Sequence, residues 1–189
     1  MLLGGGSSCQ ACGCVKAECF SGQTPTTGSI EFSLSDPVAQ AIEVGSAGVT
    51  LTSVTIHNDG ISLPLVAKFG GGYTNAPRCS MWSSSALSPS SCPNDKIPAG
   101  SGLLVTLTPP ASFTGATWVF THSGYSLSAN TTYWVVMDCE GGSQSAFWKY
   151  EEYEMDIDCI CYFLSAFSNN VGASWAGGKG GFRYLMDVA

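Results

Sequence analysis

Hydrophobic and polar positions along this chain alternate in short runs that are separated by turn-forming residues. Such runs recur about ten times, which is the pattern of a sandwich or a barrel. No 3.6-residue periodicity persists for three helical turns. The sequence therefore predicts an all-β fold, an antiparallel β-sandwich or jelly roll with little helix. The predicted strands cover residues 29–34, 40–44, 49–57, 63–69, 103–108, 116–121, 132–138, 146–154, 157–167 and 181–188.

The run 49–57 shows this alternation most clearly. Val49 and Leu51 face the core in this pattern, while the threonines beside them face outward. The alternation then slips by one position, so that Ile56 faces the core as well. Such a slip predicts a β-bulge near Ser53.

Segment 127–137 reads Leu-Ser-Ala-Asn-Thr-Thr-Tyr-Trp-Val-Val-Met and joins a polar turn directly to an aromatic and β-branched run. This composition predicts a buried strand. Because successive side chains of a strand point to opposite faces, the run divides into two sets. The sets are Tyr133, Val135 and Met137 on one face, and Trp134 and Val136 on the other.

The same segment resembles the "Leu-x-Ala-Asn/Gly-Thr-x-Tyr-Trp-Val-Val" start of a strand in choice-of-anchor R domains. Related sandwich modules occur in bacterial surface proteins and in phage tail or fibre proteins. The resemblance covers roughly residues 48–189, and includes Ser174-Trp175 and Gly181-Phe-Arg-Tyr-Leu185. It implies a binding or structural module. The Cys-rich start and the acidic segment 151–158 lie outside it.

Charge limits the possible partners. Charged residues make up only 11% of the 189 residues, and the net charge is −7. The lysines and arginines are spaced singly, so no basic cluster follows a phosphate backbone, which argues against nucleic acid. The start lacks the features of a secretory signal, and no apolar run approaches the ~20 residues of a membrane-spanning helix. We expect no membrane insertion, and a location in a virion or else at a cell surface or outside the cell.

The chain is expected to have two parts, a Cys-rich N-terminal assembly segment over residues 1–28 and a β-sandwich domain over residues 29–189. In this interpretation Leu2 and Leu3 provide an apolar contact to a neighbouring subunit. The glycines that follow let two backbones approach closely. The expected partners are other copies of this chain and other particle or fibre proteins.

Four thiols crowd the N-terminal segment, at Cys9, Cys12, Cys14 and Cys19. Four thiolates can hold zinc, although structural zinc sites usually take their ligands from two separate turns. Disulfides and reduced thiols fit the same pattern. The chain has nine cysteines, so at least one is left outside any pairing within the chain. No cofactor is required by this segment, and zinc stays an alternative.

Residues 70–102 are rich in Gly, Ser, Pro and Asn, and predict a long loop without a strand. Cys79 and Cys92 lie in this loop, and a disulfide between them would restrain it. The alternative is two separately buried thiols. Cys139 and Cys159 are further disulfide candidates, as partners of the N-terminal thiols.

Segment 151–158 reads Glu-Glu-Tyr-Glu-Met-Asp-Ile-Asp and alternates with a period of two. It predicts a strand with one acidic face, formed by Glu152, Glu154, Asp156 and Asp158. Four carboxylates in one row repel each other unless a cation or a basic partner neutralises them. A calcium site, a contact with basic residues of another subunit and a plain solvated face are the alternatives.

Aromatic residues suggest a glycan contact, because Trp82, Trp118, Trp148 and Trp175 lie in or near predicted loops or strand ends, with Tyr73 and Tyr125. The competing interpretation buries at least three of the five tryptophans. His57 and His122 belong to no catalytic or metal-ligating motif, and are interpreted as polar residues at strand ends.

No catalytic constellation is recognisable, so we expect the chain not to be an enzyme. The favoured function is a structural subunit of a virion, such as a capsid decoration, baseplate or fibre protein, with host glycans as a further contact. An extracellular filament subunit or adhesin is the alternative. A carbohydrate-binding module of an enzyme comes third.

Overall fold

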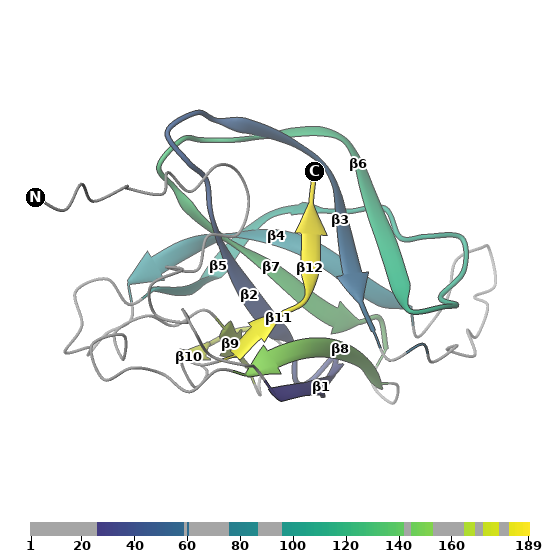
Figure 1. The fold of residues 1–189 in the computed structure, drawn as a ribbon. Helices are drawn as coiled ribbons and strands as arrows, with labels where there is room; N and C mark the ends of the chain where they lie inside the picture. The colour runs from purple at the N-terminus through teal and green to yellow at the C-terminus, as the bar shows by residue number, and fades with distance from the viewer. Residues whose placement is uncertain are drawn as a thin grey trace, which may run out of the picture.

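A computed structural model describes residues 26–58, 60, 76–86, 96–141, 145–152, 165–168, 172–177 and 182–189. These residues form twelve β-strands and no helix, which confirms the predicted all-β fold (Figure 1). In chain order the strands are β1 (Thr26–Ser33), β2 (Val38–Glu43), β3 (Val49–His57), β4 (Pro77–Ala86), β5 (Lys96–Thr106), β6 (Thr117–Leu127), β7 (Thr132–Cys139), β8 (Ser145–Glu152), β9 (Ser165–Phe167), β10 (Ala176–Gly177), β11 (Phe182–Tyr184) and β12 (Met186–Val188).

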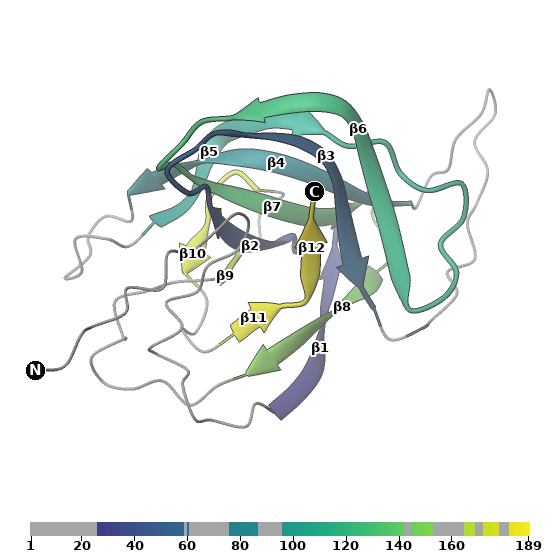
Figure 2. The same ribbon diagram turned by 45° about the horizontal axis from the view of Figure 1, so that its top comes forward.

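The strands pair into three antiparallel sheets. The largest has the order β10-β9-β2-β7-β4-β5, and the two smaller sheets have the orders β1-β8-β11 and β12-β3-β6. One face of the six-stranded sheet packs against both small sheets around a shared core, which makes a sandwich (Figure 2). The layers also join at one edge, where the backbones of Thr108 and Thr121 exchange two hydrogen bonds of 2.7 and 2.9 Å.

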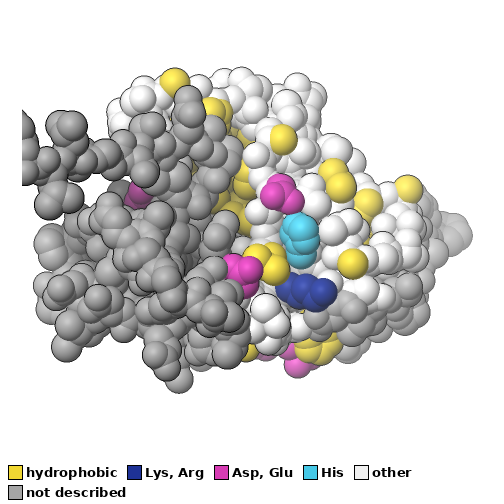
Figure 3. Space-filling view, viewed as in Figure 1, with side chains coloured by type: hydrophobic (Ala, Val, Ile, Leu, Met, Phe, Trp, Pro, Cys, Tyr) yellow, Lys and Arg dark blue, Asp and Glu magenta, His cyan; other side chains and the backbone are white. Residues whose placement is uncertain are grey.

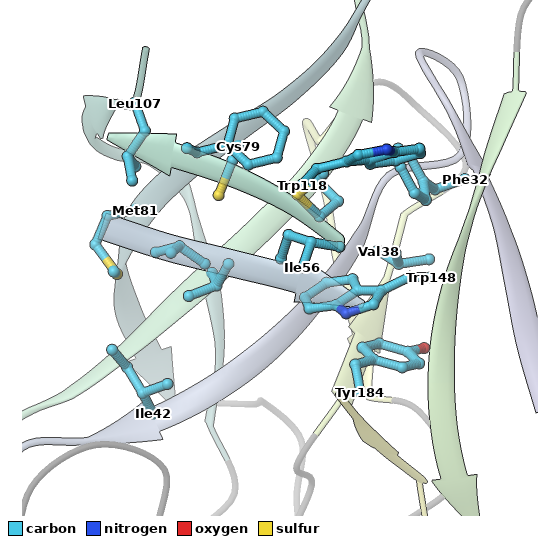
Figure 4. Close-up of a cluster of buried hydrophobic side chains, with 14 of the residues drawn as sticks. Phe32, Val38, Ile42, Ile56, Cys79, Met81, Leu107, Trp118, Trp148 and Tyr184 are labelled. Carbon is cyan, nitrogen blue, oxygen red and sulfur yellow. The ribbon is translucent and has the colours of Figure 1, made fainter. Parts of the chain in front are cut away.

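The shared core is formed by side chains that point inward from strands of all three sheets (Figure 4). Its largest members are aromatic, and Trp118, Phe120 and Trp148 are each at most 2% exposed. Phe113 meets Trp118 edge-on, with the ring centroids 5.2 Å apart. Because each buried side chain of this size contributes about 1.5–3 kcal/mol, this core dominates the stability of the sandwich.

β7 is buried on both of its faces. Tyr133, Val135 and Met137 belong to the shared core, whereas Trp134 and Val136 lie on the opposite side of the sheet. This confirms the division that the alternating pattern predicted. β7 is apolar on both sides because it lies inside the six-stranded sheet, between β2 and β4, with a hydrophobic cluster on each face.

A second hydrophobic cluster covers the outer face of the six-stranded sheet. Trp134 and Trp175 belong to it, and Trp82 packs against it with its ring edge-on to Trp175, at 5.8 Å between the centroids. The sheet curls around this cluster, because β10 at one edge lies against β5 at the other. The chain near β10 approaches β5 closely, since a β-carbon added to Gly100 of β5 would lie 3.0 Å from the carbonyl oxygen of Ala173.

The predicted bulge in the run 49–57 is confirmed. β3 pairs with β6, and the register shifts between Leu51 and Ser53. Leu51 on one side of the shift is 1% exposed, and Ile56 on the other side is fully buried. The shift therefore lets both halves of β3 turn their apolar side chains toward the same core.

The prediction that residues 70–102 contain no strand is wrong. β4 occupies ten of these residues and lies between β7 and β5, and β5 begins at Lys96. Cys79 and Met81 of β4 point into the shared core and are fully buried. Ser, Arg and Pro have weak strand preference, so the sequence does not indicate β4. The pairing of β4 with β7 outweighs this weak preference. Pro77 occupies the first position of the strand, where proline is tolerated.

The disulfide prediction is wrong for Cys79 and Cys139. Both are free thiols, fully buried in the shared core. Cys79 lies opposite Met137, and Cys139 lies opposite Pro77. Each thiol therefore fills space between β4 and β7 as a small apolar side chain. Cys92 and Cys159, the other two candidates, lie outside the described residues.

We expect Cys79 and Cys139 to resist alkylation in the folded protein. Burial raises the pKa of both thiols, that of Cys139 to about 12, so the reactive thiolate is scarce near neutral pH. Iodoacetamide treatment with and without urea, followed by peptide mapping, should show both residues modified only after unfolding. Native-state modification of either thiol, or a disulfide-linked peptide that contains one, would contradict this packing.

Candidate functional site

Residues 182–189, which we call the strap, cross from one small sheet to the other. β11 pairs with β8, and β12 pairs with β3. Between them, the Leu185 N–H donates to the Lys149 carbonyl at 2.8 Å, and the Leu185 carbonyl accepts from the His57 N–H at 3.2 Å. Figures 1 and 2 show the strap as the yellow arrows between β8 and β3. The single strand predicted over residues 181–188 is thus two short strands in different sheets.

Tyr184 is the buried anchor of the strap and is 4% exposed. Its backbone N–H donates a hydrogen bond of 2.7 Å to Oε1 of Gln40 on β2. Gln40 is 3% exposed, so this bond satisfies a polar side chain inside the protein. Burial raises the pKa of the Tyr184 hydroxyl to about 12, and a hydrogen bond with Ser165 of β9 opposes that rise.

Trp148 of β8 fixes the strap from the core side. Its indole ring is fully buried and lies beside the ring of Tyr184, with 4.8 Å between the centroids (Figure 4). Its Nε1–H donates to the Leu185 carbonyl at 2.9 Å. One side chain therefore makes both the apolar and the polar contact to the strap.

The strap slot consists of Gln40, Trp148 and Ser165 together with the edges of β3 and β8. Its polar atoms bind the strap chiefly through the strap's backbone. This is how proteins recognise an extended peptide, with backbone hydrogen bonds for affinity and side-chain pockets for specificity. On the outer side, His57 Nε2 lies 3.0 Å from Oδ2 of Asp187, but Asp187 is 78% exposed, so this pair contributes little.

Replacing Gln40 with leucine is expected to lower the free energy of unfolding by about 1–3 kcal/mol, because it leaves the buried Tyr184 N–H without its acceptor. Urea unfolding measures the loss, and the Tyr184 amide should exchange its hydrogen faster. Glu43→Gln is the matched control on the same strand, since Glu43 is exposed and its change should be within about 0.5 kcal/mol. A Gln40→Leu protein as stable as the wild type would show that this bond is dispensable.

A paired charge lies on the outer face of the six-stranded sheet. Arg78 of β4 lies opposite Asp138 of β7, and its Nε and an Nη donate to the two carboxylate oxygens, both at 2.7 Å. The Arg78 side chain is 40% exposed and that of Asp138 is 20% exposed. Burial raises the pKa of Asp138, while the guanidinium opposes that rise. The pair is structural, because it joins two neighbouring strands side by side.

Arg78→Met should lower the free energy of unfolding by about 1–2 kcal/mol, less than for a fully buried pair because this one is partly exposed to solvent. Without Arg78 the folded-state pKa of Asp138 rises further above its unfolded value. The stability lost should therefore be largest near neutral pH and shrink as the pH falls through that raised pKa. Unfolding measured across pH tests this, with Arg78→Met/Asp138→Asn as the control that lacks the trend. A loss that grows in acid would contradict it.

Most of the sites predicted from sequence lie outside the described residues and stay predictions. Cys79, Cys139 and Glu152 are the exceptions. Glu152 ends β8, opposite Thr26 and Phe182 in the register. The predicted strand over residues 146–154 is confirmed as far as Glu152. The predicted site residues outside the described ranges are Leu2, Leu3, Cys9, Cys12, Cys14, Cys19, Tyr73, Cys92, Glu154, Asp156, Asp158 and Cys159.

The tryptophans belong mainly to the core, as the competing interpretation expected. Trp118, Trp134, Trp148 and Trp175 are at most 7% exposed, so their faces are not open for stacking on a glycan. Trp82 is half-buried, and its Nε1–H donates to the Ser80 hydroxyl at 2.9 Å.

The two histidines differ in their positions. His57 ends β3, as predicted. His122 lies inside β6 and not at its end. Its Nδ1 accepts a hydrogen bond of 3.0 Å from the Gly124 N–H. That bond stabilises the irregular part of β6 opposite the bulge, which explains a polar ring within a strand.

Sequence reasoning missed Gln40 and Ser165 as parts of a site. Gln40 lies on the same face of β2 as the buried Val38 and Ile42. A polar residue on the apolar face of a strand indicates a buried hydrogen bond. Ser165 gave no such signal, because its role depends on the distant Tyr184.

No protein-family model matches the chain, and neither a curated protein nor a solved structure gives a significant match. Over the described ranges, we find no helix that is long and apolar enough to cross a membrane. The same ranges hold no group of three or more His, Cys, Asp or Glu side chains arranged for a metal ion.

Proposed function

We propose that this chain is a non-enzymatic structural subunit of a virion, such as a capsid decoration, baseplate or fibre protein. The observation that carries the proposal is that three of its buried polar side chains bind its own backbone. Gln40 binds the Tyr184 N–H, Trp148 binds the Leu185 carbonyl, and the Tyr133 hydroxyl accepts from the Ser128 N–H at 2.9 Å. Groups engaged in this way stabilise a scaffold.

The surface supports the same proposal. On the face seen in Figure 3, the described residues carry few charged side chains, and most of the hydrophobic ones are separated by neutral polar groups, apart from one strip that borders the grey atoms. A nucleic-acid partner requires basic clusters, and a lipid surface requires a broad apolar patch. Protein contacts through neutral polar surface fit better. A glycan contact would have to use rings that keep exposed area, such as Trp82 and Tyr125.

Particle composition tests the proposal. Virions from the source that encodes this chain would be purified by density gradient, and their proteins would be quantified by mass spectrometry. We expect the chain in the particle band at many copies per particle, and gold-labelled antibodies should place it on the particle. Absence from the band, with the chain recovered in soluble or cell-surface fractions instead, would contradict a virion role.

A second candidate function is an extracellular filament subunit or adhesin. The strap slot favours it, because extended segments held between strand edges commonly join subunits into fibres. The same fractionation separates the two candidates: a filament subunit would be sheared from the cell surface and would be absent from purified particles.

A further inference from the structure

We propose that the strap slot accepts the strap of a second copy of this chain, so that subunits join by exchanging residues 182–189. This adds a means of assembly to the proposed structural role. It stands on the contacts of the strap alone, whichever assembly the chain belongs to. The partner is thus identified as an identical chain.

The strap can leave without disturbing any other strand pair. β11 is an edge strand of the sheet β1-β8-β11, and β12 is an edge strand of the sheet β12-β3-β6. Each pairs on one side only among the described strands. Departure of the strap leaves the pairings β1-β8 and β3-β6 intact, as well as the whole six-stranded sheet.

The slot requires an occupant once the strap has left. Oε1 of Gln40 and Nε1 of Trp148 lose their partners inside the protein, and the strand edges at Lys149 and His57 lose their backbone bonds. Buried polar groups without partners are strongly unfavourable. An identical strap from a neighbour restores every one of these bonds, and so the exchanged and the closed forms have the same contacts.

The slot also selects this segment over unrelated ones. Tyr184 supplies a ring that packs on Trp148 and a hydroxyl that bonds to Ser165. Three positions later, Asp187 lies directly opposite Thr55 in the pairing of β12 with β3. An extended segment without an aromatic anchor at the position of Tyr184 would lose the contacts on which the slot depends.

A pair of cysteine variants tests the exchange directly. One full chain carries Thr55→Cys and another carries Asp187→Cys, at positions that are cross-strand partners. A chain with both substitutions bonds within itself and establishes that the geometry permits the link. The two single variants are unfolded under reducing conditions, refolded together and oxidised. Each is also refolded with the wild type, as the control for the native cysteines.

Strap exchange predicts a covalent dimer, with a peptide linking positions 55 and 187, in the mixture of variants and not in either control. Its yield should increase with the protein concentration during refolding, since exchange is bimolecular. If the double variant links within one chain while the mixture gives no such dimer at any concentration, exchange does not occur and the proposal is wrong.

A second experiment tests the slot itself in the folded full chain. A protease site inserted among residues 178–181 is cut after folding, and a labelled peptide with the sequence of residues 182–189 is added. We expect the peptide to replace the cut strap, and the Tyr184→Ala peptide to bind about thirtyfold more weakly or worse. No uptake of the labelled peptide, or equal binding of both peptides, would overturn the proposal. Both experiments use purified chain, so their failure leaves the virion proposal untouched.

Discussion

Replacing Trp148 with alanine is expected to lower the free energy of unfolding by about 4 kcal/mol, at the upper end of what core substitutions cost. The indole is fully buried, and its removal leaves a cavity beside Tyr184. It also removes the hydrogen bond from Nε1 to the Leu185 carbonyl. Equilibrium unfolding in urea, followed by both circular dichroism and fluorescence, measures the change.

The control for this substitution is Trp148→Phe, which keeps most of the ring contact and loses the hydrogen bond. It should cost distinctly less than alanine. A Trp148→Ala protein that loses under about 1 kcal/mol would mean that the ring is not packed in the core at all, because even single surface substitutions reach about 0.5 kcal/mol.

Trp134→Ala should have an effect of similar size, about 4 kcal/mol, although Trp134 lies on the other side of the sheet. The residue is fully buried in the second cluster, with Trp175 and Val136. If the outer face of the sheet were simply solvated, the substitution would cost little. The urea unfolding curve of this variant therefore tests whether β7 is buried on both faces.

Phenylalanine substitutions at the two tryptophans should differ. Among the described residues, Nε1 of Trp134 has no hydrogen-bond partner, whereas Nε1 of Trp148 binds the Leu185 carbonyl. Trp134→Phe removes a buried N–H donor that has no acceptor among the described residues. Trp148→Phe removes a donor that has one, and so it loses a hydrogen bond. We expect Trp148→Phe to cost about 1 kcal/mol more. The reverse order would contradict this difference in hydrogen bonding between the two indoles.

The parts of the fold that could be predicted are those that local pattern determines. In β7 the alternation of Tyr133, Trp134 and Val135 gave both the strand and its two faces. In β3 the slip after Leu51 gave the bulge, because a strand must keep its apolar side chains on one side. These features follow from neighbouring residues alone.

β4 could not be predicted, because its stability comes from its partners. Ser83, Ser84 and Ser85 give no strand signal, yet two of them pair with β5 and the third pairs with Tyr133 of β7. The disulfide prediction for Cys79 failed for the same reason. A cysteine in a supposed loop suggests a crosslink, whereas a cysteine on a central strand is a core residue.

The strap slot could not be predicted either, because its residues come from four strands that are far apart in the sequence. Gln40 and Tyr184 are separated by 144 positions and meet through a backbone amide, which leaves no side-chain pattern to detect. The change of sheet at Leu185 is also unmarked, because the run before and after it reads as one continuous strand. Only the arrangement of the three sheets brings these groups together.

Amide hydrogen exchange along residues 182–189 tests the central claim, that the strap is held by all three sheets. The N–H groups of Tyr184, Leu185 and Ala189 bind Gln40, Lys149 and Ser53 respectively. These three amides are expected to exchange far more slowly than those of an unstructured peptide, because each is released only when the strap leaves its slot. Exchange of all three at the rate of an unstructured peptide would contradict it.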